Sequence, residues 1–200
     1  MMILHGSPPS PFVRKVRIAA AVLDLTDAIE IVPTDVLDPD DRIRQQNPLG
    51  KIPALVLDDG PVLYDSPVIL EYLDERAGGG RILPRSGHGR YKALTEQVLA
   101  DGLMDAAVLQ VYEGRFRAPE NHEPKWLAHQ AGKVQRTLAA FEHTTPEGPR
   151  TVADIALACA LGYLDLRFPG TWRDAHPRLV AWLDEFAGEI PSFAATRYTP

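Results

Sequence analysis

The sequence predicts a small α/β domain with a mixed sheet, followed by a domain made only of helices. Three observations support this prediction. The first third of the chain alternates strand-like and helix-like patterns, the glycine-rich stretch "GGGRILPRSGHGR" at residues 78–90 interrupts them, and no alternating strand pattern follows it. A chain of 200 residues with a hydrophobic fraction of 45% is long enough for one large or two small packed domains.

The first domain, residues 1–78, is expected to have the element order βαβ-α-ββα. A βαβ unit requires a parallel strand pair, and the hairpin that follows adds antiparallel strands. Apolar residues at helical spacing, such as Phe12, Val16 and Leu23, indicate the first helix. The expected elements are strands at 2–5 and 28–33, a hairpin at 53–64, and helices at 11–25, 39–46 and 67–77.

A linker at residues 79–90 is expected to lead to an all-helical domain at residues 91–200. The stretch "TVADIALACALGYLD" begins with Thr151 and Asp154, which have the spacing of a capping box at the start of a helix. The expected helices of this domain lie at about 91–114, 123–143, 151–167 and 176–188.

Composition argues against several classes of function. The net charge of −6 does not favour binding to nucleic acid or to an anionic membrane surface, and no apolar run approaches the roughly 20 residues of a membrane span. The single cysteine, Cys159, lies in an apolar helical run, where a buried and inert thiol is expected. No histidine pair has the spacing of metal ligands, so no bound metal is expected. A cytoplasmic protein is expected because neither a signal peptide nor a membrane span is recognised.

Two helices are expected to begin with the dipeptide Ser-Pro, at Ser10 and at Ser66. A serine side chain accepts a backbone N–H as the N-cap, and proline fits the first helical position. Two well-capped helices are the simplest explanation. Both starts follow strands, however, so two helix N-termini with partial positive charge are expected side by side at one edge of the sheet. Such a pair suits a ligand with more than one negative group, and Asp65 would suit an amine of that ligand.

The segment "NPLGKIPAL" adds a third element, because Pro53 opens a strand. If the bond between Ile52 and Pro53 is cis, the backbone groups of Ile52 face outward and can pair with an extended peptide, as an added strand would. A trans proline at the start of a strand is the alternative. A small peptide with an amine, carboxylates and a thiol, such as glutathione, has groups that match these three elements.

These residues resemble a known family. The stretches "SPFVRKVRIA", "NPLGKIPAL" and "YDSPVILEYLDE" are similar to the N-terminal, thioredoxin-like domain of cytosolic glutathione S-transferases, in the same order and spacing. The stretch "TVADIALACALGYLD" resembles the core helix of the second, all-helical domain of that family. The resemblance therefore covers nearly the whole chain, and it implies a fold, a co-substrate and a set of site residues.

The resemblance implies that Ser10 is the catalytic residue and that no cofactor is needed besides glutathione as co-substrate. Tyr112 and Phe116 are expected to line the pocket of a small hydrophobic electrophile, with packing in the core as the alternative. Ser7 is the alternative contact for the sulfur, and the partner of the glycyl carboxylate is open between Arg42, Arg44 and Lys51. The residues implied to bind glutathione are Ser10, Phe12, Lys51, Ile52, Pro53, Asp65 and Ser66.

The implied nucleophile is the thiolate of glutathione, which the hydroxyl of Ser10 would stabilise. A free thiol is ionised to only about a few per cent at neutral pH, and a hydrogen bond together with a helix dipole favours the charged form. A cysteine at position 10 would indicate disulfide chemistry, so serine favours a transferase over a reductase or peroxidase. The alternative is a glutathione-binding or regulatory member of the same fold without enzymatic activity.

The resemblance also implies a homodimer. A basic cluster on the first helix, formed by Arg14, Lys15 and Arg17, is expected to be a solvated face or a contact between subunits.

Overall fold

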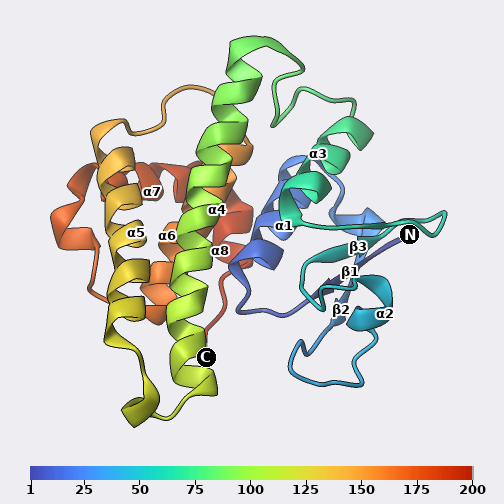
Figure 1. Cartoon of the computed structure of the whole chain (residues 1–200). Coiled ribbons are helices and arrows are strands. Elements are labelled where there is room, and N and C mark those ends of the chain that lie inside the picture. The colour runs from blue at the N-terminus through green and yellow to red at the C-terminus, as the bar shows by residue number, and fades with distance from the viewer. Residues whose placement is uncertain (200) are drawn as a thin grey trace.

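The computed structural model describes residues 1–199, and its N-terminal third contains a four-stranded mixed sheet (Figure 1). The strand order is β2-β1-β3-β4. Strand β1 pairs parallel with β2 and antiparallel with β3, and β3 pairs antiparallel with β4, which confirms the predicted βαβ unit and hairpin. The strands are β1 (Met2–Gly6), β2 (Ile29–Pro33), β3 (Ala54–Val56) and β4 (Val62–Leu63).

Helices α1 (Pro11–Val22) and α3 (Ser66–Arg76) accompany the sheet and lie close to their predicted positions. The predicted helix at 39–46 is wrong over its first half, since α2 spans only Ile43–Gln46. The cause is local competition for backbone N–H groups. The carboxylates of Asp38 and Asp41 accept N–H bonds from residues close by in the chain, and this arrangement replaces the first helical turn.

The remainder of the described chain is helical. Helix α4 begins at Gly87, before the predicted start at 91, and the short α8 was not predicted because five residues are too few for a helical pattern. The division into domains at 1–78 and 91–200 with a linker at 79–90 stays a prediction. The helices are α4 (Gly87–Phe116), α5 (Pro124–His143), α6 (Val152–Arg167), α7 (Pro177–Glu189) and α8 (Pro191–Ala195).

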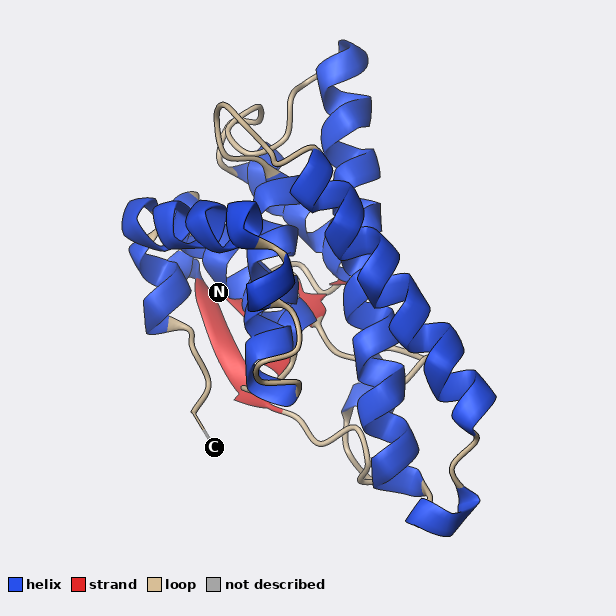
Figure 2. Ribbon diagram, turned by 90° about the vertical axis from the view of Figure 1, so that its left-hand side faces the viewer, coloured by secondary structure: helices blue, strands red, loops and turns tan. Residues whose placement is uncertain are grey.

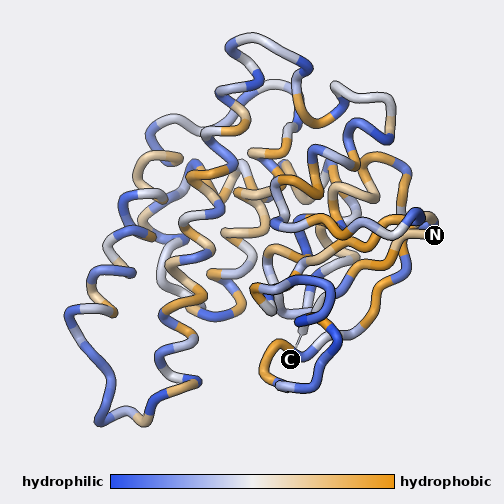
Figure 3. Tube along the Cα trace, turned by 45° about the vertical axis from the view of Figure 1, so that its right-hand side comes forward, coloured by the Kyte–Doolittle hydropathy of each residue, from blue (hydrophilic) through white to orange (hydrophobic). Residues whose placement is uncertain are grey.

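Helix α6 forms the centre of the helical half. It begins at the predicted capping box, in which the Thr151 N–H donates to Asp154 and the Ala153 N–H donates to the Thr151 hydroxyl. The helix is apolar nearly all round, so it packs against both α4 and α1. Apolar segments cluster in the strands and the inner helices, whereas the turn between α4 and α5 is hydrophilic (Figure 3).

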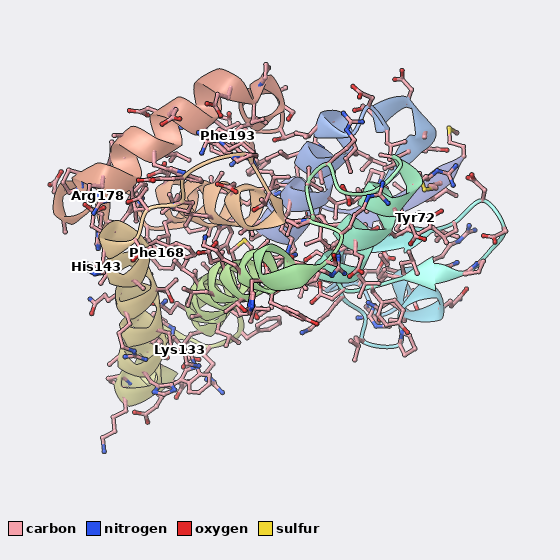
Figure 4. The ribbon with its side chains drawn as sticks, turned by 90° about the horizontal axis from the view of Figure 1, so that it is seen from above. Tyr72, Lys133, His143, Phe168, Arg178 and Phe193 are labelled. Carbon is pink, nitrogen blue, oxygen red and sulfur yellow. The ribbon has the colours of Figure 1, made fainter. Side chains whose placement is uncertain are left out.

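The sheet half, which ends with α3, packs against the helical half, which begins with α4, chiefly through the contact of α1 with α6. In Figure 2 the helical half faces the viewer and the sheet lies behind it, and Figure 4 shows Tyr72 in the sheet half and His143 and Arg178 at the opposite end. One continuous cluster of buried apolar residues runs through both halves. No helix among the described residues is long and apolar enough to cross a membrane.

The prediction of a solvated or intersubunit basic cluster is wrong for two of its three members. Lys15 is fully buried, and its ammonium nitrogen lies 2.6 Å from a carboxylate oxygen of Asp101 on α4. Arg14 is also buried and donates to the carbonyl of Phe193 at 2.5 Å. The acceptors lie 86 and 179 residues away along the chain, so local sequence patterns cannot reveal them.

Candidate functional site

A cleft of about 690 Å³ opens between the sheet half and the helices α4 and α6. Its walls come from the loops after β1 and β2, the segment before β3, the start of α3, and the facing sides of α4 and α6. Of the predicted site residues, Ser66 does not line it. The predicted residues that line the cleft are Ser10, Phe12, Lys51, Ile52, Pro53, Asp65, Tyr112 and Phe116.

Ser10 lies at the first helix start, where it is the predicted N-cap of α1 with Pro11 in the first turn. Its hydroxyl oxygen accepts the N–H of Val13 at 3.3 Å. Because the helix uses the oxygen as an acceptor, the hydroxyl proton is free to be donated elsewhere. Ser10 is half-buried and lines the cleft, as Ser7 also does. The geometry thus places a hydrogen-bond donor at the positive end of a helix, facing an open cavity.

The second helix start differs from the prediction, because Asp65 and not Ser66 is the N-cap of α3. The carboxylate of Asp65 accepts the N–H of Ser66, so an acidic cap takes the place of the hydroxyl. Ser66 is the first helical residue and is fully buried, and its hydroxyl has no hydrogen-bond partner among the described residues. Asp65 and Ser10 line the same cleft, so the two helix starts are open to one ligand volume.

The segment before β3 lines one side of the cleft. The Ile52–Pro53 peptide bond is cis, as the sequence suggested, and both residues line the cleft. Asn47 holds the segment: its side-chain amide donates to the carbonyl of Lys51 at 2.9 Å and accepts the N–H of Leu49 at 3.0 Å. Asn47 was not predicted, although an asparagine before proline, as in "NPLG", is a sequence signal for a turn. The structure shows that its side chain is buried.

The three cations considered for the glycyl carboxylate are now distinguished by position. Arg44 donates to the carbonyls of Val36 and Asp38, so its guanidinium is used to hold the loop after β2. Neither Arg42 nor Arg44 lines the cleft, whereas Lys51 does.

The opposite wall of the cleft is formed by α4 and α6. The rings of Tyr112 and Phe116 meet edge to face, with centroids 5.4 Å apart. Further residues on this wall were missed, among them Arg115, Tyr163 and Arg167. Their signal was helical spacing, since Arg115 lies three residues after Tyr112 and Arg167 four residues after Tyr163.

Comparison with known proteins identifies the family. The chain matches the model of the glutathione S-transferase N-terminal domain over residues 4–81 and that of the C-terminal domain over residues 124–185. The chain belongs to the glutathione S-transferase family. The resemblance stated from the sequence is therefore confirmed, and the fold is a thioredoxin-like domain followed by an all-helical domain.

Relatives of this glutathione S-transferase family member carry different names. The uncharacterized GST-like protein YibF of Escherichia coli is 36% identical over 98% of both chains. The maleylacetoacetate isomerase of Pseudomonas aeruginosa is 31% identical over 90% of this chain and 87% of its own. A glutathione transferase family member from Pseudomonas fluorescens, crystallised with bound glutathione, is 43% identical over the whole of both chains with a TM-score of 0.93. A second structure from the same organism contains S-(propanoic acid)-glutathione.

Two further features of this family member concern its charges and its thiol. Asp105 on α4 lines the cleft, and its pKa is raised by burial, which the charge of Lys51 opposes. Cys159 is fully buried in α6, as expected, and burial raises the pKa of its thiol to about 12. Among the described residues, no group of three or more His, Cys, Asp or Glu side chains is placed to hold a metal.

Proposed function

We propose that the chain is a glutathione S-transferase in activity, which joins the glutathione thiolate to a small electrophile. The observation that carries the proposal is the shared cleft of Ser10 and Asp65. Each lies at the N-terminus of a helix, and Ile52 borders the same volume. In this arrangement Asp65 binds the γ-glutamyl amine, Ile52 pairs with the cysteinyl backbone, and the Ser10 hydroxyl donates to the sulfur.

The remaining residues are proposed to complete the glutathione site. Lys51 meets the glycyl carboxylate, since it is the one of the three cations considered that lines the cleft. Phe12 and Pro53 border the peptide. Ser66, whose hydroxyl has no partner among the described residues, is proposed to bind the γ-glutamyl end together with Asp65. The relative from Pseudomonas fluorescens with bound glutathione supports glutathione as the co-substrate. The cytoplasm, where thiols stay reduced, is the compartment we propose.

In the proposed reaction the thiolate attacks an electrophilic carbon, and Ser10 remains chemically unchanged. A hydrogen bond to a charged group contributes about 1.5–3 kcal/mol. Since one pKa unit corresponds to about 1.4 kcal/mol, Ser10 and the α1 dipole together are sufficient to make the thiolate the main species at neutral pH.

The test compares Ser10→Ala with Ser7→Ala. Ser10→Ala should raise the pKa of the bound thiol by about one to two units and lower kcat/KM for a generic aryl halide about 10- to 100-fold. Thiolate absorbance during a pH titration measures the first effect, and steady-state kinetics measures the second. Ser7→Ala should change both much less, and the reverse order would assign the sulfur contact to Ser7.

A non-enzymatic glutathione-binding protein of the same fold is the second candidate. The acidic loop after β2 favours it. Asp35 borders the cleft, and its negative charge stands where a cation would strengthen the binding of an anionic peptide such as glutathione. Binding of glutathione without ionisation of its thiol and without conjugation would support this candidate. Failure to bind glutathione at millimolar concentration would refute both candidates.

We also propose a homodimer. Large apolar side chains are exposed on two neighbouring helices, Val68 on α3 and Tyr91 and Val98 on α4. The ion pair of Glu71 with Arg90 joins these helices close to that surface. Exposed apolar groups on adjacent elements are typical of a subunit interface.

A further inference from the structure

The wall of the cleft opposite the glutathione elements carries a cluster of two arginines and two tyrosines. The Arg–Tyr cluster consists of Tyr112 and Arg115 on α4 and of Tyr163 and Arg167 on α6, and all four residues line the same cleft as Ser10. Each helix contributes one arginine and one tyrosine from a single face, at spacings of three and four residues. Helices α4 and α6, which are distant in sequence, thus bring two arginines and two tyrosines to the same wall of the cleft.

Each arginine of the cluster lies beside an aromatic ring. The guanidinium carbon of Arg115 is 5.1 Å from the ring centroid of Tyr112, and that of Arg167 is 5.9 Å from the centroid of Tyr163. Both distances are within the range of cation–π contacts, which orient a guanidinium while its N–H groups remain available. Burial raises the pKa of the Tyr163 phenol, and the charge and hydrogen bond of Arg167 and the charge of Arg115 oppose that rise, so both cations lie near this phenol.

The two arginines have no carboxylate partner within the described part of the chain. Other arginines do, as in the pairs Arg117–Glu113 and Arg173–Asp165. Arg115 and Arg167 form no such pair among residues 1–199. The Nε atom of Arg167 is moreover buried without a hydrogen-bond partner there. The Arg167 side chain as a whole is half-buried and lines the cleft, so its outer N–H groups are the ones that an acceptor on a ligand can reach.

The two ends of the cleft differ in charge. Asp65 and Asp105 border the end nearer α3 together with Lys51, and the charges of Lys51 and Asp65 act on the pKa of Asp105 in opposite directions. Asp105 precedes Tyr112 by seven residues of α4, which separates them by about 10 Å along the helix axis. The cationic cluster therefore lies beyond the acidic end, at a distance that leaves room for a ring-sized molecule. The apolar side chains of Val108 and Leu109 line the cleft on the intervening turn.

We infer that the Arg–Tyr cluster binds a carboxylate on the second substrate, so that the electrophile is a carboxylic acid with an aromatic or unsaturated body. This inference rests on the proposed transferase function and narrows its small hydrophobic electrophile to one that carries a carboxylate. Guanidinium groups bind carboxylates through paired N–H donors, and tyrosine hydroxyls can complete the set. The apolar turn of α4 holds the body of the molecule between the carboxylate and the sulfur.

A matched pair of probes tests the inference, 4-chloro-3-nitrobenzoate and its neutral methyl ester. In both, the thiolate attacks the carbon that bears chlorine, a C–S bond forms, and chloride leaves with the electron pair of the C–Cl bond. Each kcat/KM is divided by the rate constant of the uncatalysed reaction with glutathione, because the two probes differ in intrinsic reactivity. The resulting acceleration should be about tenfold or more greater for the acid than for the ester.

The variants Arg167→Gln and Arg115→Gln should each reduce this preference for the acid, and the double variant should abolish it. Arg136→Gln is the matched control, since Arg136 is exposed on α5 and does not line the cleft. The inference is overturned if wild type prefers the ester, or if the variants lower the acceleration of acid and ester equally.

Failure of the transferase proposal would be seen separately, as absence of turnover for both probes although glutathione binds. In that case calorimetry with unreactive 3-nitrobenzoate and its methyl ester decides the inference. In the presence of glutathione, the acid should bind to wild type more tightly than the ester and should lose about tenfold in affinity in Arg167→Gln. Equal binding of the acid to wild type and Arg167→Gln would refute a carboxylate site at this cluster.

Discussion

At the scale of single residues, the same side chain often serves the fold and offers a group to the cleft. Ser10 caps α1 with its oxygen and leaves its proton free, whereas Asp65 caps α3 with one oxygen and keeps a negative charge at the cleft. Replacing either side chain therefore removes a cap and a proposed ligand contact together. Kinetic effects of such variants must be compared with their effect on stability, since the loss of a cap alone costs about 1 kcal/mol.

His5 offers a test of pH dependence at this scale. It is buried in β1, 3.2 Å from the hydroxyl of Thr34, and burial lowers its pKa below the ordinary value of 6.5, partly opposed by the charge of Asp41. Below about pH 6.5 the unfolded state then binds a proton that the folded state resists, so stability falls as pH falls.

Urea unfolding of wild type and His5→Gln at several values between about pH 7.5 and about pH 5.5 measures this effect. The free energy of unfolding should fall less steeply with decreasing pH in His5→Gln. His88→Gln, at an exposed position of α4, serves as the control. Parallel pH profiles for wild type and His5→Gln would contradict the prediction.

At the scale of elements, the buried ion pair between Lys15 on α1 and Asp101 on α4 connects the two halves. Lys15 is fully buried, and the second oxygen of Asp101 lies 2.8 Å from its nitrogen. Lys15→Met would leave a buried carboxylate unpaired, so it should destabilise the protein by about 3–5 kcal/mol. The double variant Lys15→Met with Asp101→Leu should regain most of that loss, because it removes both charges.

Denaturant unfolding of the single and double variants measures this coupling. The exposed pair of Lys92 and Glu96 on α4 is the matched control, and Lys92→Met should cost no more than about 0.5 kcal/mol. A double variant less stable than Lys15→Met would show that the pair is not the source of the effect.

The elements also show what the sequence could and could not predict. Apolar periodicity and Ser-Pro starts were sufficient for the element order, because strands and long helices follow local patterns. The second N-cap was assigned to Ser66, since Asp65 and Ser66 are both good caps and only the backbone decides between them. Lys15 was misplaced because its partner Asp101 is far away in the chain.

The candidate site was predicted only in part, because local sequence patterns do not show contacts between residues that are far apart in the chain. Ser10, Ile52 and Asp65 stand in short motifs at element ends, and all three line the cleft as expected. Arg115 and Arg167 stand in the last turns of long helices, and only the packing of α4 against α6 brings them to one cleft.

At the scale of the whole molecule, the proposed dimer makes a prediction about size. Light scattering should give a molar mass twice the 22.0 kDa of one chain. Tyr91→Lys combined with Val98→Lys should shift the protein toward monomers, since both side chains are about two-thirds exposed in a single chain, at 69% and 66%. Trp126→Lys on α5 is the control, since Trp126 is also exposed but is not one of the residues of the proposed surface on α3 and α4. A monomeric wild type at high concentration would contradict the proposal.

The deep position of Cys159 has a consequence for handling reactive compounds. The chain has one cysteine, and its side chain is fully buried in α6. Because burial raises the pKa of its thiol to about 12, the thiol stays protonated at physiological pH. Under the proposed function, any alkylating molecule that enters the cleft therefore meets a single competent thiol, that of the bound glutathione. The proposed transferase is then protected from inactivation by its electrophilic substrates, because it offers them no sulfhydryl to modify.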